Sequence, residues 1–238
     1  MIGASKVLDV LQVLRPSVPE DLLAVDPGYE TDEFGVVHQQ DLTVRERYDV
    51  EYVRSRYDTI PEKVREMSML RAGFILGATG AGKLRSVLDI GYGNGDFLRV
   101  MHEAFGADCY GLDVSGYPVP DGCRQLEWAG VMGRHFQLVT LFDSLEHMPS
   151  LEVLDYLDCG FLAVTAPCFH PDLGADWFRA WKHRRPGEHL HHFSPDSLTG
   201  LMASKGYRLL VVDSIEDALR GSAPDGTWNT FTSVFERG

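Results

Sequence analysis

The sequence lacks the cysteine patterns of disulfide-bonded domains and of zinc modules. Its cysteines, at positions 109, 123, 159 and 168, form no C-x-x-C pair. A disulfide framework and a structural zinc site of the paired-cysteine type are therefore both unexpected. We interpret the four side chains as reduced, buried thiols of a cytoplasmic protein.

Long apolar segments and an excess of positive charge are also missing. No run is long and apolar enough to cross a bilayer, so no membrane partner is expected. The run Val7–Leu14 contains Asp9 and Gln12 and lacks a small-residue cleavage site, which excludes a signal peptide. It predicts an amphipathic helix that begins after Ser5 and ends at Pro16. The net charge of −13 argues against a protein that binds long duplex nucleic acid.

The N-terminal third of the chain is predicted to be loop followed by helix. Residues 17–45 carry proline, glycine and acidic residues without clear periodicity and are predicted to be mostly loop. Residues 44–76 have apolar residues at helical spacing, including Tyr48, Tyr52 and Tyr57. They predict one or two helices, the second beginning at Pro61. We therefore expect an N-terminal helical extension over residues 1–83, lying over the site as a lid.

From Ser86 onward, short apolar runs alternate with helical segments. This order is typical of strand–helix–strand units in a parallel sheet, and predicts a doubly wound α/β domain over residues 84–238. Two terminal runs predict further strands, added as antiparallel strands to one edge of the sheet. The predicted strands cover residues 86–90, 108–112, 136–142, 160–166, 207–213 and 228–236, with a short, weaker one at 125–128.

A glycine-rich loop follows the first of these strands. Residues 87–98 read V-L-D-I-G-Y-G-N-G-D-F-L, so a buried strand ends in D-x-G-x-G-x-G and a helix begins at once. Such glycines let a ligand touch the main chain, and the N–H groups at the helix start suit polar or anionic groups. The third glycine comes one residue earlier than in the dinucleotide fingerprint, which favours a different nucleoside cofactor. Asp113 ends the second strand about 20 residues later, where a carboxylate can bond ribose hydroxyls.

These segments resemble the class I S-adenosylmethionine-dependent methyltransferases over residues 84–238. The resemblance implies a Rossmann-like, seven-stranded, mostly parallel sheet and S-adenosyl-L-methionine as cofactor. It places the glycine loop against the methionine part of the cofactor, Asp113 on the ribose, and Glu127 and Trp128 near the adenine, although Trp128 suits a core position equally well. The expected cofactor-binding residues are Asp89, Gly91, Tyr92, Gly93, Asn94, Gly95, Asp113, Val114, Glu127, Trp128, Phe142 and Asp143.

A competing motif lies just before this loop. Residues 77–83 match the phosphate-binding pattern G-x-x-x-x-G-K, but Leu84 stands where that loop needs serine or threonine. A helical pattern precedes the segment and a strand follows it, which is the reverse of the required order. We interpret it as a linker between helix and strand.

Three polar side chains follow the strand 136–142, where ligands of an open parallel sheet bind. Asp143, Glu146 and His147 have the spacing that shares one face of a helical turn, so we expect them to be catalytic, with His147 as general base. The segment resembles the ubiquinone-type O-methyltransferases. It is also similar to the small-RNA 2′-O-methyltransferases, in which E-x-x-E-H and a later histidine hold Mg²⁺, although Asp143 is shorter than that glutamate. A divalent ion on the three residues, with His189, His191 or His192 as a fourth ligand, therefore stays open.

An aromatic and cationic insert covers residues 177–192 in this otherwise acidic chain. Its charges favour a phosphate- or carboxylate-bearing acceptor, and its tryptophans could stack on a ring. The alternative is a solvated turn anchored by Trp177 and Trp181. The residues expected to bind the substrate are Trp181, Lys182, Arg184, Arg185, His189 and His192.

Taken together, these features predict an S-adenosylmethionine-dependent methyltransferase that acts on an oxygen of a small acceptor, with an anionic group favoured. Two alternatives remain at this stage. The same fold also serves methyltransferases of nucleic acids or nucleotides, and it occurs in non-catalytic, cofactor-binding subunits.

Overall fold

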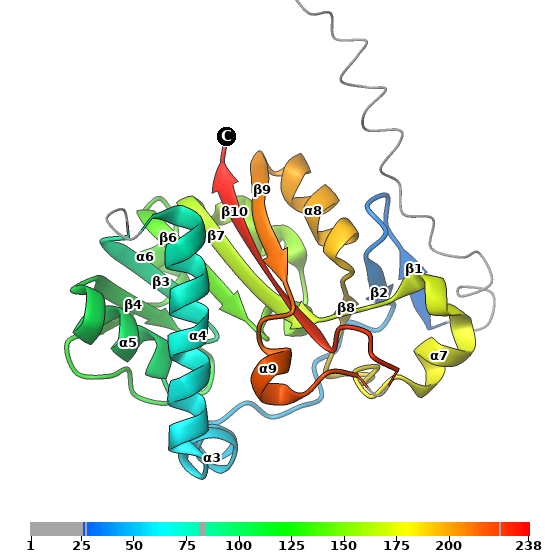
Figure 1. Cartoon of the computed structure of the whole chain (residues 1–238), viewed down its shortest axis with the longest axis horizontal. Helices are drawn as coiled ribbons and strands as arrows, with labels where there is room; N and C mark the ends of the chain where they lie inside the picture. The colour runs from blue at the N-terminus through cyan, green and yellow to red at the C-terminus, as the bar shows by residue number, and fades with distance from the viewer. Residues whose placement is uncertain (1–25, 27, 81–83, 224) are drawn as a thin grey trace, which may run out of the picture.

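The computed structural model describes residue 26 and residues 28–80, 84–223 and 225–238 (Figure 1). The amphipathic helix predicted near residues 5–16 lies outside these residues. Within the described ranges, no helix combines the length and the apolar character needed to cross a bilayer.

The centre of the molecule is a seven-stranded sheet in the order β5-β4-β3-β6-β7-β10-β9. All neighbouring strands are parallel except β10, which runs antiparallel to both β7 and β9. This confirms the predicted doubly wound, mostly parallel sheet. The strands are β3 (Ser86–Ile90), β4 (Asp108–Leu112), β5 (Arg124–Gln125), β6 (His135–Phe142), β7 (Asp158–Pro167), β9 (Tyr207–Asp213) and β10 (Thr230–Arg237).

The last two strands add to one edge of the sheet and are antiparallel to each other, as predicted. Their order is β7-β10-β9, so β10 lies between β7 and β9, and β9 points the same way as the parallel strands. The position of β10 gives it two partners. Its apolar side chains Phe231, Val234 and Phe235 are consequently fully buried.

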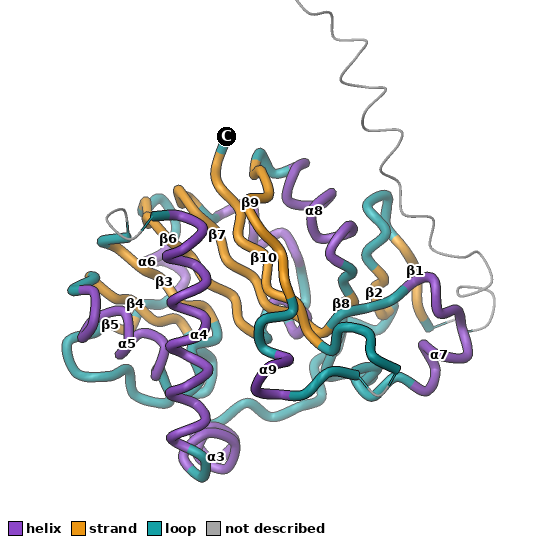
Figure 2. Tube along the Cα trace, in the orientation of Figure 1, coloured by secondary structure: helices purple, strands orange, loops and turns teal. Residues whose placement is uncertain are grey.

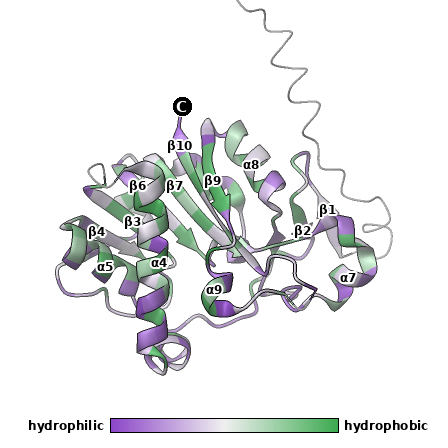
Figure 3. Cartoon of the chain, viewed as in Figure 1, coloured by the Kyte–Doolittle hydropathy of each residue, from purple (hydrophilic) through white to green (hydrophobic). Residues whose placement is uncertain are grey.

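Helices cover both faces of the sheet, as the ribbon in Figure 1 shows. On one face, α4 (Pro61–Thr79) and α5 (Asp96–Phe105) form a core with alternate residues of the strands. On the other face, α6 (Trp128–Val131) and α8 (Pro195–Ser204) pack on the remaining side chains. Burial on both faces explains the continuous apolar runs of the central strands, which Figure 3 shows as hydrophobic.

Helix α4 begins at Pro61, as predicted, and continues past Gly77 to Thr79. Gly80 ends it with a φ of 83°. Because this helix precedes and β3 follows, the segment 77–83 lacks the strand–loop–helix context of a phosphate-binding loop; residues 81–83 lie outside the described ranges. The buried side chains of α4 are Ser68, Ala72, Ile75 and Thr79, whereas the apolar side chains of Val64, Met67, Leu70 and Phe74 are half-buried.

The N-terminal segment contains two strands where mostly loop was predicted. β1 (Tyr29–Thr31) and β2 (Val37–Gln39) form an antiparallel sheet with β8 (His191–His192), visible at the right of Figure 2. Strands of three residues are too short to show a periodicity in the sequence. The remaining elements are α3 (Val50–Val53), the π-helical turn η1 (Arg54–Asp58), the 3₁₀ turns η3 (Leu145–His147), η4 (Leu151–Tyr156) and η5 (Pro171–Leu173), and the helices α7 (Gly174–Ala180) and α9 (Asp217–Arg220).

Candidate functional site

A cavity of about 850 Å³ lies at the carboxyl ends of β3, β4 and β6. Its walls come from three places: the loops after these strands, the N-terminal segment 44–57, and residues 147–156. Ligands of open α/β sheets bind at this edge. The structure thus brings the glycine loop, Asp113 and His147, all selected from the sequence, to one cavity.

The glycine loop needs glycine for steric reasons. Gly91, Gly93 and Gly95 have φ values of 77°, 57° and 74°, in the left-handed region that other residues avoid. A Cβ on Gly91 would lie 2.6 Å from Cβ of Ser144, and one on Gly95 would lie 2.5 Å from Cδ of Pro120. Gly91 and Gly93 line the cavity, so main chain forms that wall.

Asp113 is fixed by the loops around it. Its Oδ2 accepts a hydrogen bond from the N–H of Gly93 at 2.9 Å, and its Oδ1 accepts one from the N–H of Ser115 at 2.7 Å. Each carboxylate oxygen keeps a further acceptor position. The carboxylate therefore suits a ligand that donates two adjacent hydroxyl groups.

An apolar wall stands next to Asp113. Val114, Trp128 and Met132 line the cavity and are 79%, 37% and 52% exposed. Strand β5 ends at Gln125, earlier than predicted, and Trp128 begins α6 instead of entering the core. The core interpretation of Trp128 was therefore wrong, and the cavity position fits a flat ligand group.

Half of the residues expected to bind the cofactor support the loop without lining the cavity. Asp89 is buried and accepts a hydrogen bond from Thr140 Oγ1 at 2.8 Å; burial raises its pKa to about 7. Asn94 Oδ1 accepts from the N–H of Asp96 at 3.2 Å at the start of α5. Tyr92 and Gly95 are the buried residues of the glycine loop. Glu127 is exposed and directly precedes α6. The ring of Phe142 packs against the guanidinium of Arg71, with 4.3 Å between the guanidinium carbon and the ring centre.

Asp143 lies in the cavity wall with a left-handed φ of 49°. Its Oδ2 accepts hydrogen bonds from Arg71 Nη2 at 3.0 Å and from Arg220 Nη2, and Arg71 Nε also donates to the buried Glu216 at 2.6 Å. Burial alone would raise the pKa of Asp143, but Arg220 and Arg71 together hold it below its ordinary value. Asp143 is thus an ionised member of a charge network.

His147 lies in the turn η3 and has a defined tautomer. Its Nδ1 is 2.7 Å from the carbonyl oxygen of Glu188, which only accepts, so the proton is on Nδ1 and the lone pair is on Nε2. The hydroxyl of Tyr48 lies 2.9 Å from the same Nδ1. Burial lowers the pKa of His147, so the ring is neutral and its Nε2 can accept a proton.

Glu146 and His189 complete a buried cluster with His147. Ligand atoms of the three side chains lie within 4.8 Å of one another, with Nε2 of His147 3.8 Å from Oε1 of Glu146. Among the described residues, neither carboxylate oxygen of Glu146 has a hydrogen-bond partner, and Nδ1 of His189 has none either. Burial and the charge of Asp143 raise the pKa of Glu146 well above its ordinary value.

The predicted trio of Asp143, Glu146 and His147 is therefore not the set that converges. Asp143 turns to the arginines because its backbone is left-handed, whereas His189 approaches from the loop before β8. Of the other histidines proposed as a fourth ligand, His191 bonds His38 and the carbonyl of Met148, and His192 is buried against Phe178 and Trp181.

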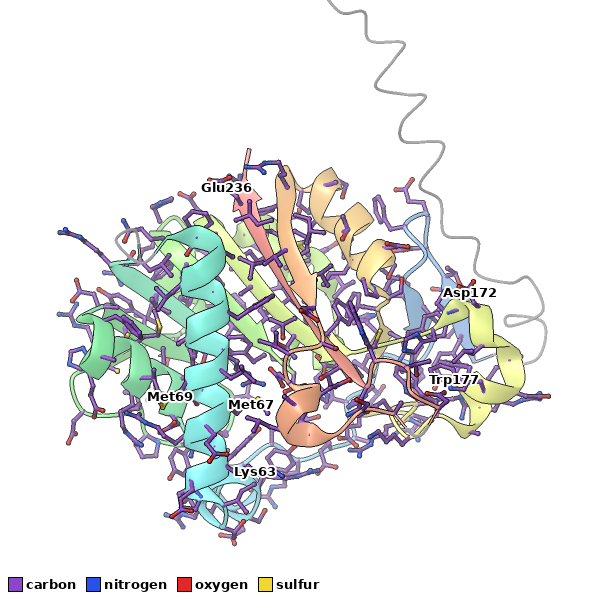
Figure 4. The ribbon with its side chains drawn as sticks, viewed as in Figure 1. Lys63, Met67, Met69, Asp172, Trp177 and Glu236 are labelled. Carbon is purple, nitrogen blue, oxygen red and sulfur yellow. The ribbon has the colours of Figure 1, made fainter. Side chains whose placement is uncertain are left out.

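No residue of the aromatic and cationic insert lines the cavity, although its Glu188 and His189 contact the cavity residue His147. Trp181 stacks on Trp177 at 5.2 Å; Trp177, labelled in Figure 4, belongs to α7. Arg184 pairs with Asp26, and Arg185 Nη1 donates to Glu188 Oε1 at 2.8 Å. None of the six residues expected to bind substrate lines the cavity, and Lys182 points to solvent. Trp177 and Trp181 pack together as the alternative interpretation expects, and substrate binding by the insert stays a prediction.

Sequence reasoning expected the N-terminal segment to cover the site but named none of its tyrosines as site residues. Tyr48, Tyr52 and Tyr57 line the cavity, and a Cβ on Gly93 would lie 3.1 Å from the ring of Tyr57. Their spacing was interpreted as an ordinary apolar helix face. Three tyrosines at such a face carry hydroxyl groups that a core rarely accommodates, and this was the available signal.

Comparisons with known proteins agree with this geometry. A family model described as a methyltransferase domain matches residues 52–212, which include every strand of the central sheet except β10. A search of curated proteins finds no match.

Solved structures give the same fold at low sequence identity. The methyltransferase chain of a complex with the Haloferax volcanii Trm112 methyltransferase activator is 16% identical, with a TM-score of 0.57 over 82% of this chain and 99% of that one. A sarcosine dimethylglycine methyltransferase from Galdieria sulphuraria is 15% identical, with a TM-score of 0.54 over 74% and 86%. Magnesium protoporphyrin IX methyltransferase from Synechocystis with bound SAH is 14% identical, with a TM-score of 0.51 over 75% and 85%.

Proposed function

Because the chain belongs to the methyltransferase-domain family and is an S-adenosylmethionine-dependent methyltransferase, we propose that it methylates an oxygen of a small-molecule acceptor. The observation that carries this proposal is one shared cavity. The glycine loop, Asp113 and a neutral, tautomer-fixed His147 all line it.

The cofactor fits the glycine-loop side of this cavity. Gly91, Gly93, Asp113 and Trp128 line the cavity. The main chain at Gly91 and Gly93 would hold the methionine part of the cofactor, Asp113 would accept from the ribose hydroxyls, and Trp128 would pack on the adenine. When bound, S-adenosylmethionine supplies a methyl group already activated on a sulfonium. The protein contributes position and a dry environment.

His147 takes the proton of the acceptor hydroxyl. Its Nε2 lone pair is free because Nδ1–H donates to the carbonyl of Glu188. Removing this proton would make the acceptor oxygen a better nucleophile toward the methyl carbon, and the methyl–sulfur bond would break to release S-adenosylhomocysteine. The D-S-L-E-H segment around His147 also supports a place in the ubiquinone-type branch.

We assign a covering role to the N-terminal extension, residues 1–83. Tyr48 reaches His147, Tyr57 lies against Gly93, and Arg71 holds Asp143. These three contacts link the extension to the base and to the glycine loop. They support its function as a lid over the site.

Titration calorimetry tests the cofactor site. Asp113→Ala should weaken binding of S-adenosylmethionine and its homocysteine product at least about tenfold, since two hydrogen bonds to a charged group are lost. Asp121→Ala, an exposed carboxylate in a nearby turn, is the matched control and should bind normally. Absence of binding to the wild-type protein would refute the proposal.

Methyl transfer tests the base. A screen of hydroxyl-bearing small molecules is read by product formation, and His147→Asn should then lower the rate about 10²- to 10⁴-fold without changing cofactor affinity. His135→Asn, at an exposed histidine paired with Asp158, should leave the rate unchanged. Tight cofactor binding with no turnover in the screen would favour the non-catalytic subunit instead.

A metal-assisted reaction is the second candidate. The unpartnered oxygens of buried Glu146, with His147 and His189, form a donor set that suits a divalent cation. Such an ion would lower the pKa of the acceptor hydroxyl. Elemental analysis tests this candidate, because the Glu146→Gln variant should contain less bound metal than the wild type. Equal metal content in the two proteins, together with activity that is insensitive to chelators, would exclude the metal-assisted reaction.

A further inference from the structure

The cavity has a second half beyond the residues assigned to the cofactor. This half is built by the segment before α3 and by the turn η4, and its wall is mostly aromatic or apolar: Tyr48, Tyr52, Met148, Val153 and Tyr156. If the glycine-loop half holds the cofactor, as proposed above, the acceptor must lie here. The composition of this wall then reports on the chemistry of the acceptor.

Two carboxylates stand at the exposed rim of this half. Glu46 and Glu152 line the cavity from its two sides, and within the described ranges neither has an ion-pair partner. The basic residue of the same rim, Arg47, is already paired, because its Nε lies 2.8 Å from Oδ2 of Asp49. The side chain of Arg47 is 87% exposed. The rim therefore presents uncompensated negative charge.

The aromatic wall, like the negatively charged rim, favours a ligand with positive charge. Tyr48 and Tyr52 meet edge to face at 5.1 Å, and both residues line the cavity. One face of Tyr52 already holds a cation, because the guanidinium of Arg56 lies 5.2 Å from the ring centre. Ring faces attract cations and repel anions, especially where water is excluded.

We propose that the acceptor is a cation with an apolar, ring-bearing body, whose positive group lies between Glu46 and Glu152. The rings of Tyr48, Tyr52 and Tyr156 contact the body, and the hydroxyl to be methylated faces His147. An acceptor with a phosphate or carboxylate would place like charges together at this rim. This applies equally to a nucleic acid, whose backbone carries a charge on every nucleotide.

Three matched phenols test the charge preference on the wild-type protein loaded with S-adenosylhomocysteine. They are 4-(2-aminoethyl)phenol, 4-ethylphenol and 3-(4-hydroxyphenyl)propanoate, which share a ring and differ in charge. Saturation-transfer NMR at millimolar concentrations should give the cation an affinity at least about tenfold above the anion, with the neutral phenol between them. Raising the ionic strength should narrow the difference.

Matched variants connect this preference to the rim. Glu46→Gln and Glu152→Gln should each reduce the cation-to-anion ratio at least about threefold, whereas Glu66→Gln, at an exposed carboxylate of α4 outside the cavity, should not. An anion that binds as well as the cation, or no binding of any probe to the loaded protein, would overturn the inference. Binding of S-adenosylhomocysteine is measured first and separately, so its failure would instead overturn the proposed function.

Discussion

The hydroxyl of Tyr48 lies 2.9 Å from Nδ1 of His147, and the two rings meet edge to face at 5.4 Å, although 99 positions separate the residues. Through this contact the N-terminal segment fixes the ring of the candidate base. The carbonyl of Glu188 bonds the same nitrogen from the other side. Two segments that are distant in the sequence therefore contact the same nitrogen of His147.

Removing the hydroxyl of Tyr48 should slow methyl transfer without affecting cofactor binding. Tyr48→Phe keeps the ring, so we expect kcat to fall about three- to tenfold, the worth of one hydrogen bond. Product formation with the acceptor found in the screen gives kcat, and titration calorimetry gives the affinity for the cofactor. Tyr207→Phe is the control, because it removes a hydroxyl bonded to Cys159 far from the cavity; an equal loss in both variants would contradict the role of Tyr48.

Arg71 should be important for stability as well as for the site. Arg71→Met leaves the fully buried carboxylate of Glu216 without its main partner, and we expect a loss of about 3 kcal/mol in the free energy of unfolding. Arg208, on β9, pairs with Glu236 at the surface, so Arg208→Met should cost less than about 1 kcal/mol. Urea unfolding measures both values. Similar losses in the free energy of unfolding for the two variants would contradict the expectation that leaving the buried carboxylate of Glu216 without Arg71 is more costly than breaking a surface ion pair.

Asp89 should make stability depend on pH. Burial raises its pKa to about 7, so the folded state prefers the protonated form. This contribution to stability is full below the unfolded pKa of about 4 and is lost as the pH rises through 7. From pH 5 to pH 8, the wild type should lose about 3 kcal/mol relative to Asp89→Asn.

Unfolding curves at several pH values measure this difference. Asp108→Asn, at an exposed position at the start of β4, should track the wild type across the same range. A pH-independent gap between the wild type and Asp89→Asn would show that Asp89 is ionised in the folded state.

Two glycines should respond to alanine in opposite ways. Gly91→Ala places a methyl group 2.6 Å from Ser144 at a φ of 77°, and should destabilise the protein by about 1 to 3 kcal/mol and abolish cofactor binding. Gly73→Ala, on an exposed turn of α4 with no atom near its new Cβ, should stabilise the protein by up to about 1 kcal/mol. Thermal unfolding and calorimetry report both effects, and a stable, cofactor-binding Gly91→Ala variant would argue against close main-chain contact.

Part of the site was predictable from short stretches of sequence. The alternating glycines after β3 and the carboxylate at the end of β4 each predict a ligand site from a few neighbouring residues. They are expected to lie close together because the carboxyl ends of parallel strands meet at one edge of the sheet. The apolar runs of the central strands are equally local signals, since both faces of those strands are buried. The fold and the glycine-loop side of the cavity followed from these alone.

Other features depended on which segments meet in three dimensions. The sequence determined the sheet, the glycine loop and the position of Asp113, because each arises from neighbouring residues and backbone geometry. Only the tertiary structure decided that Asp143 pairs with Arg71 and Arg220, that His189 joins Glu146, and that tyrosines of the N-terminal segment line the cavity while the predicted substrate-binding residues of the basic insert do not. Long-range packing sets the direction of loop side chains, and no local pattern of residues encodes it.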